Sequence, residues 1–226
     1  MSTFGQISLA AVIRNMSDLE FASIMVQTLN LILLTALELG ELRQLLKTTF
    51  QTSTSPDDRS VFTALFNCWC HNPVATLSLC LLAQAYDLAS ILVQKFSEVE
   101  ITVGFLMQID KLVQLIESPV FVHLRLQLLE VDAHFHPSLL KSLYGLLMLL
   151  PQSTAFKTLK DRLATVSSLQ QHLGRAGSAS TSGSGKKTKV DDYQDLLRQF
   201  EDVQQRHARG RQGAIQSRSL STLIRK

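Results

Sequence analysis

The residues with the clearest capacity for chemistry are Cys68, Cys70 and His71, which fall within four positions around Trp69. Structural zinc sites usually place two cysteines two to four residues apart on a turn and add a second ligand pair elsewhere. Here the cysteines lie two positions apart on a predicted helix, so their side chains diverge by about 200°. The pattern favours buried packing thiols, with metal or redox chemistry as the alternative. With Cys80, the odd number of clustered cysteines is typical of reduced intracellular thiols.

A second pair of potential ligands, His134 and His136, flanks Phe135 just before Pro137. No clear third ligand lies nearby, so we expect a solvated loop there and no metal site. The sequence also contains no G-x-S-x-G, no H-E-x-x-H and no phosphate-binding glycine-rich loop. A nucleophile needs an activating base and an orienting partner, and no such set is visible. We therefore predict a protein without catalytic residues and without a cofactor.

The residues after the cysteines predict a joint between two helices. Pro73 disfavours helical geometry at Asn72, and Asn72 can then cap a helix that begins at Pro73. We assign Trp69, His71, Asn72 and Pro73 to core packing and capping rather than to a binding site.

The elements around this joint are predicted to be helical throughout. Hydrophobic residues make up 46% of the chain and charged residues 18%, with only 10 glycines and 5 prolines. Leucine dominates and β-branched runs are short, which favours helices over strands. Apolar residues recur three or four positions apart. The expected helices cover residues 4–14, 17–39 (with a Ser17–Glu20 capping box and a break at Gly40), 41–50, 57–70, 74–85, 87–96, 100–117, 119–131, 138–150 and 154–166.

Residues 1–170 therefore predict an all-α domain of helical hairpins. Helices of this length joined by tight turns form either a bundle or a HEAT-like α-solenoid, and the absence of a strict repeat leaves both open. No window offers about eighteen uncharged apolar residues, so we expect no membrane span and no secretory signal.

The chain changes character after this domain. Residues 174–189 form a predicted Gly/Ser-rich linker, of natural or engineered origin, followed by an amphipathic helix over residues 190–207. Residues 208–226 are predicted to be a disordered basic tail. Residues 186–226 carry 10 basic and 5 acidic side chains, whereas residues 1–185 carry 12 and 14. The tail lacks the aromatic residues that single-strand binders use for stacking, so we predict no nucleic-acid partner.

The apolar stripe of the last helix consists of Leu196, Leu197, Phe200 and Val203. A helix with so narrow a stripe is marginal alone in water and requires a partner. The candidates are the chain's own core, another copy, or a different protein, and these four residues are the predicted partner-binding site.

Several stretches of the chain resemble the C-terminal region of the Vac14-type ArPIKfyve scaffold family. The most specific runs are W-C-H-N-P, within Phe66–Phe96, and L-Y-G-L-L-M-L-L-P, within Ser142–Leu163. Phe21–Lys47, Phe105–Val131 and Asp192–His207 also resemble that family. The family's long N-terminal array of HEAT-like repeats is missing, so we expect a fragment or a short form.

The resemblance implies a non-catalytic scaffold that regulates phosphatidylinositol 3,5-bisphosphate. The family holds together the phosphatidylinositol 3-phosphate 5-kinase (PIKfyve/Fab-type) and the opposing Sac-domain phosphoinositide phosphatase. Its C-terminal region is associated with binding that phosphatase and with self-association, as a pentamer. The implied location is cytoplasmic and peripheral on endosome and vacuole membranes, with mainly indirect membrane contact. An alternative from the charge distribution is a peripheral membrane adaptor recruited through the basic tail.

Overall fold

The computed structural model describes residues 19–50, 56–174 and 193–224, and every regular element in these ranges is a helix. The predicted helix over residues 4–14, the Ser17 end of the capping box and most of the predicted linker lie outside the described residues. The elements are α2 (Leu19–Thr35), η1 (Leu37–Leu39), α3 (Gly40–Thr48), α4 (Pro56–Trp69), α5 (Pro73–Leu82), α6 (Tyr86–Lys95), η2 (Phe96–Glu98), α7 (Val103–Ile116), η3 (Pro119–Phe121), α8 (Val122–Gln127), α9 (His136–Leu149), α10 (Thr154–Gly174) and α12 (Gln194–Ile224).

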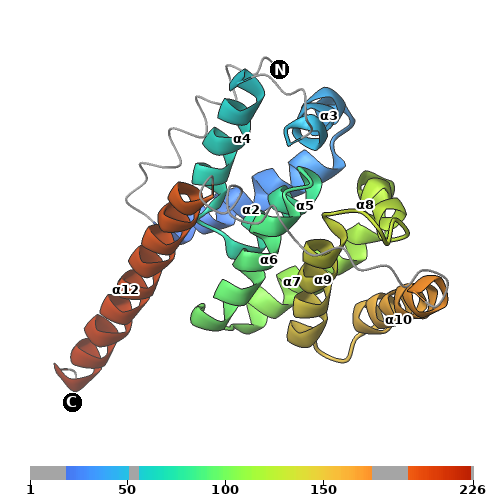
Figure 1. Cartoon of the computed structure of the whole chain (residues 1–226). Helices are drawn as coiled ribbons and strands as arrows, with labels where there is room; N and C mark the ends of the chain where they lie inside the picture. The colour runs from blue at the N-terminus through green and yellow to red at the C-terminus, as the bar shows by residue number, and fades with distance from the viewer. Residues whose placement is uncertain (1–18, 51–55, 175–192, 225–226) are drawn as a thin grey trace.

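The centre of the molecule is α5, whose residues after Pro73 are all buried (Figure 1). A helix that is apolar on every side must be surrounded, and α2, α4, α6 and α7 pack around it. α6 in turn packs extensively against α9, and α10 closes the far side against α7 and α9. The prediction of an all-α fold is confirmed for the described residues, and the arrangement is consistent with a helical solenoid.

The packing of α6 on α9 depends on Gly145. A Cβ atom added at Gly145 would lie 2.2 Å from Cγ1 of Val93 on α6. The two helix backbones therefore approach more closely than any larger residue at position 145 allows.

Two arginines close the ends of helices in the same way. Nη1 of Arg43 donates to the carbonyls of Leu33 (2.9 Å) and Ala36 (2.6 Å), at the C-terminus of α2. Nη1 of Arg125 makes the equivalent contacts at the end of α7, with the carbonyls of Ile116 and Ser118. Carbonyls in the last turn of a helix lack partners within the helix, and a cation near them is favourable. Each arginine thus fixes a sharp reversal of the chain.

The first of these reversals corrects the predicted break at Gly40. The helix ends before Ala36, whose backbone is extended (φ −70°, ψ 129°), and Gly40 is the first residue of α3. Propensity pointed to glycine, but the contact of Arg43 with the preceding carbonyls decides where the chain turns. No single described helix is long and apolar enough to cross a membrane, and only the pair Leu19–Thr35 and Leu37–Thr48, bent by 82°, meets that criterion together.

Three other boundaries differ from the prediction. The expected helix over residues 119–131 is a 3-10 turn followed by the short α8, which ends at Gln127. α10 extends to Gly174, past the expected end of the domain at residue 170. α12 continues to Ile224, through residues expected to be disordered, because nothing after His207 breaks a helix as proline would.

Candidate functional site

The joint between α4 and α5 holds the neighbouring helices together. Oδ1 of Asn72 accepts a hydrogen bond from the amide of Ala75 (3.0 Å), which confirms the predicted cap. The amide nitrogen of Asn72 also donates to Gln108 of α7 (2.8 Å). Nε1 of Trp69 donates to Oδ1 of Asn30 on α2 (3.1 Å). The joint therefore fixes the positions of both α2 and α7, and the packing and capping role predicted for it is what the structure shows.

The same joint contacts α12 through a buried pair of histidines. Nδ1 of His71 lies 3.1 Å from Nε2 of His207, and both side chains are buried. Beside them, Nε2 of Gln204 donates to the carbonyl of Cys70 (2.6 Å). A nitrogen–nitrogen contact of this length needs one protonated and one unprotonated atom, so the pair does not survive with both rings charged.

Burial lowers the pKa of these imidazoles. The pKa of His207 falls to about 4, through burial and then through the charges of His71, Arg211 and Arg206. Burial, with a smaller effect of Arg206, also lowers the pKa of His71 from 6.5. The pKa of His123 is likewise lowered to about 4, mainly by burial.

These shifts predict that acid destabilises the fold. Between pH about 6.5 and about 4 the unfolded chain binds more protons than the folded chain, so the free energy of unfolding decreases as the pH falls through this window. Urea unfolding at pH 7, 6 and 5 measures the slope. His207→Gln should reduce that slope, whereas an unchanged slope would mean that His207 titrates normally in the folded state.

The other sequence-predicted ligands are separated from one another. Cys68, Cys70 and Cys80 are buried free thiols, as predicted. Burial raises the pKa of Cys68 to about 12, so its thiolate is scarce at neutral pH. Within the described ranges there is no group of three or more His, Cys, Asp or Glu side chains that could hold a metal ion.

The prediction of a solvated loop at His134 and His136 is wrong for the second histidine. His136 is the first residue of α9 and is 1% exposed, whereas His134 is exposed. Nε2 of His136 lies 3.1 Å from the carbonyl of Leu128. A contact across the turn that follows α8 buries the imidazole, and no local pattern encodes it.

The predicted partner-binding stripe of the last helix lies against the chain's own core. Phe200 and Val203 are buried, while Leu196 and Leu197 are half-buried and pack on the core. Their helix, α12, contacts α4 and α2 (Figure 1). Contact of Phe200 or Val203 with another chain would require α12 to leave this position.

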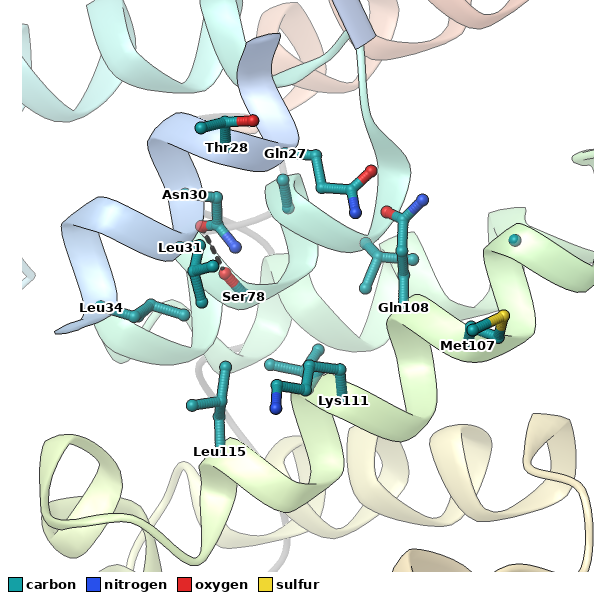
Figure 2. A pocket seen from close by; sticks show the side chains of 14 residues that line it. Gln27, Thr28, Asn30, Leu31, Leu34, Ser78, Met107, Gln108, Lys111 and Leu115 are labelled. Atoms are coloured by element: carbon teal, nitrogen blue, oxygen red, sulfur yellow. Dashed lines mark hydrogen bonds between the residues drawn. The ribbon is translucent and has the colours of Figure 1, made fainter. Parts of the chain in front are cut away.

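A groove lies between α2 and α7, with α5 as its floor (Figure 2). Its volume is about 550 Å³. Leu31 and Leu34 of α2 face Leu115 of α7 across it, and Met107 stands near one end. On the floor, the hydroxyl of Ser78 donates to Oδ1 of Asn30 (2.7 Å). The groove is the largest apolar concavity among those found in the described part of the chain.

The rim of the groove on α2 is apolar although it faces solvent. Ile24 is 56% exposed and Leu31 is 45% exposed. Between and beyond them, the hydroxyls of Thr28 and Thr35 donate to the helix's own carbonyls of Ile24 (3.1 Å) and Leu31 (2.8 Å). These threonines therefore satisfy their polar atoms internally. No charged residue occurs in α2 after Glu20.

Apolar residues also border the groove on the α7 side. Met107 is 68% exposed, Val103 is 76% exposed, and Ile101 just before the helix is half exposed. Scattered exposed apolar residues are common, but a contiguous apolar area around a concavity marks an interaction site. The groove and its rim are thus suited to hold an apolar surface of another molecule rather than to perform chemistry.

Comparison with known proteins places the chain in a family. The matching family model, which covers residues 6–166, is described as vacuolar protein 14, C-terminal, binding of Fig-4p, a Sac-domain phosphatase. A VAC14 homolog from Arabidopsis thaliana is 50% identical over 176 residues, which cover 77% of this chain and 23% of the relative. A VAC14 homolog from Schizosaccharomyces pombe is 52% identical over 156 residues, covering 69% and 18%. No solved structure gives a significant match.

A third relative is vacuole morphology and inheritance protein 14 of Saccharomyces cerevisiae, 42% identical over 155 residues, which cover 69% of this chain and 17% of the relative. The chain thus spans about a fifth of the length of these curated relatives. Because the family model covers most of the described helical domain, the chain belongs to the Vac14 family, in which it corresponds to the C-terminal phosphatase-binding region.

Proposed function

We propose that this chain is a non-catalytic scaffold module that binds a Sac-domain phosphoinositide phosphatase. The observation that carries the proposal is the match of residues 6–166 to a family model described by its binding of that partner. Through this contact the module takes part in the complex that regulates phosphatidylinositol 3,5-bisphosphate.

The shape of the molecule supports a binding role. The described residues present an uncharged apolar rim on α2, an apolar groove and exposed methionine and valine side chains on α7. Burial of such a surface is the main favourable contribution to most protein–protein association. We assign the phosphatase contact to this groove and its rim.

Three finer elements of the function are part of the same proposal. The kinase is reached through the assembled complex, because this chain covers only about a fifth of its relatives. Self-association into a homo-oligomer is supported by the end of α12, which projects beyond the helical body (Figure 1). Location at endosome and vacuole membranes follows from the partners, with mainly indirect membrane contact.

Light scattering on a sizing column tests the assembly part of this proposal. The chain should elute as an oligomer, and removal of residues 213–226 should lower its mass. A monomeric mass for the intact chain would contradict self-association. Sedimentation with anionic liposomes should leave the chain in the supernatant when the phosphatase is absent, whereas tail-dependent pelleting would favour the membrane adaptor instead.

Matched methionine substitutions test the binding surface. Met107→Asp places a charge on the groove and should weaken binding of the purified phosphatase by about 30-fold, or about 2 kcal/mol, as for a hot-spot residue. Met148→Asp changes a methionine that is 87% exposed on α9, away from the groove, and should leave binding unchanged. Biolayer interferometry measures both dissociation constants. If both variants bind equally well, the groove is not the phosphatase contact.

A further inference from the structure

The exposed rim of α2 has the spacing that fits another helix. Ile24, Thr28, Leu31 and Thr35 follow one another at intervals of four, three and four residues, and all four are exposed. This interval keeps one line of side chains on a single side of a helix, as in the seams along which helices pair. The line extends over about 17 Å at 1.5 Å per residue. A partner helix of about three turns would cover it.

A glycine on the opposite side leaves room for close approach. Gly104 lines the groove in the first turn of α7, where glycine is less favourable than alanine. The nearest atom to a Cβ added there would be Oγ1 of Thr102, at 3.8 Å, and the φ of Gly104 is not positive. Neither packing nor backbone geometry within the described chain requires this glycine. The missing side chain instead keeps the α7 end of the groove open to an incoming backbone.

The charge of the groove indicates the chemistry of its occupant. Among the described residues that line it, Lys111 is the only charged one, and the remaining polar side chains are amides and hydroxyls. Lys111 is exposed and reaches into the groove between Gln108 and Leu115 (Figure 2). A single cation in an otherwise uncharged apolar site favours one acidic side chain on the partner.

We propose that the groove between α2 and α7 binds an amphipathic helix of the phosphatase, which carries one acidic residue opposite Lys111. The inference rests on the proposed function and adds the structure of the partner element. The helix lies along Ile24, Thr28, Leu31 and Thr35, crosses closest to this chain at Gly104, and is held in register by the pairing with Lys111. This is the groove mode of helix recognition, in which apolar anchors three and four residues apart provide the affinity.

Substitutions at the two determinants test the proposal in the full chain. Gly104→Leu fills the open end, and Lys111→Glu reverses the charge. Each should raise the dissociation constant for the purified phosphatase at least tenfold without lowering the melting temperature. The effect of Lys111→Glu should shrink at high salt, because a solvent-accessible ion pair is screened. Lys160→Glu on α10, which does not line the groove, should stay within twofold of the unmodified chain.

Cross-linking identifies the occupant directly. With Met107→p-benzoylphenylalanine, photolysis in the complex should attach the phosphatase at a helical segment that contains an acidic residue. Cross-links to a second copy of this chain, or to its own residues 1–18, would overturn the proposal. So would unchanged affinity in Gly104→Leu and Lys111→Glu while the unmodified chain still binds the phosphatase. If the unmodified chain does not bind the phosphatase, the proposed function itself fails.

Discussion

Replacing Gly145 with alanine is expected to lower the free energy of unfolding by about 1–3 kcal/mol, the usual range for overpacking a close contact. The added methyl group would lie 2.2 Å from Cγ1 of Val93, and α6 and α9 cannot accommodate it without moving apart. The higher helix propensity of alanine opposes this loss by at most about 1 kcal/mol. Urea unfolding followed by circular dichroism measures the change.

Gly104→Ala is the matched control for Gly145→Ala. Both are glycines in α-helices, but a methyl group at position 104 would have no neighbour closer than 3.8 Å. This variant should be as stable as the unmodified chain or slightly more stable. If Gly145→Ala also leaves the stability unchanged, α6 and α9 do not pack as closely as the structure shows.

Truncating Phe200 to alanine should separate α12 from the helical body. Phe200 is 1% exposed, and deleting a buried phenylalanine side chain typically costs about 3–5 kcal/mol. The polar contacts of α12, such as the ion pair between Lys95 and Glu201 (2.9 Å), lie at the surface and contribute only about 0–1 kcal/mol each. They do not replace the lost burial, so α12 should leave its position on α4 and α2.

Hydrogen exchange distinguishes this separation from global unfolding. In Phe200→Ala, backbone amides of α12 should lose their protection while those of the central helix α5 keep it. Asp202→Ala, an exposed position on the same helix, should leave the protection of α12 unchanged. Protection of α12 that persists in Phe200→Ala would show that the helix is held mainly by other contacts.

The features that could be predicted from the sequence are those encoded by neighbouring residues. The cap at Asn72 and the helix start at Pro73 follow from local backbone rules. Burial of the thiols at Cys68 and Cys70 follows from their apolar surroundings. The helical class follows from composition and periodicity. For each of these, the residues that decide the structure lie within one or two turns of the chain.

The features that escaped prediction depend on contacts between distant segments. His71 meets His207 across 136 positions of the chain, and no local pattern signals the pair. The turn at Ala36 is set by the later Arg43. In the same way, Ile24 and Leu33 are equivalent in the periodic pattern, yet the first is exposed and the second is buried.

One signal in the sequence could have indicated the groove. The apolar positions of α2 extend too far around the helix for a single buried face, and no charge interrupts the helix after Glu20. A surface helix normally carries charged or polar residues on the side opposite its buried stripe. The wide uncharged face thus marks a helix with a second contact, although α7, the opposite wall of the groove, becomes identifiable only from the fold.

The central claim, that this chain binds the phosphatase through the groove between α2 and α7, is tested most directly by hydrogen–deuterium exchange of the chain with and without the saturating purified phosphatase. The account predicts slower exchange on binding in residues 21–35 and 103–115, with no change in α10. Unchanged exchange in both segments, or slowing confined to α9 and α10, would contradict it.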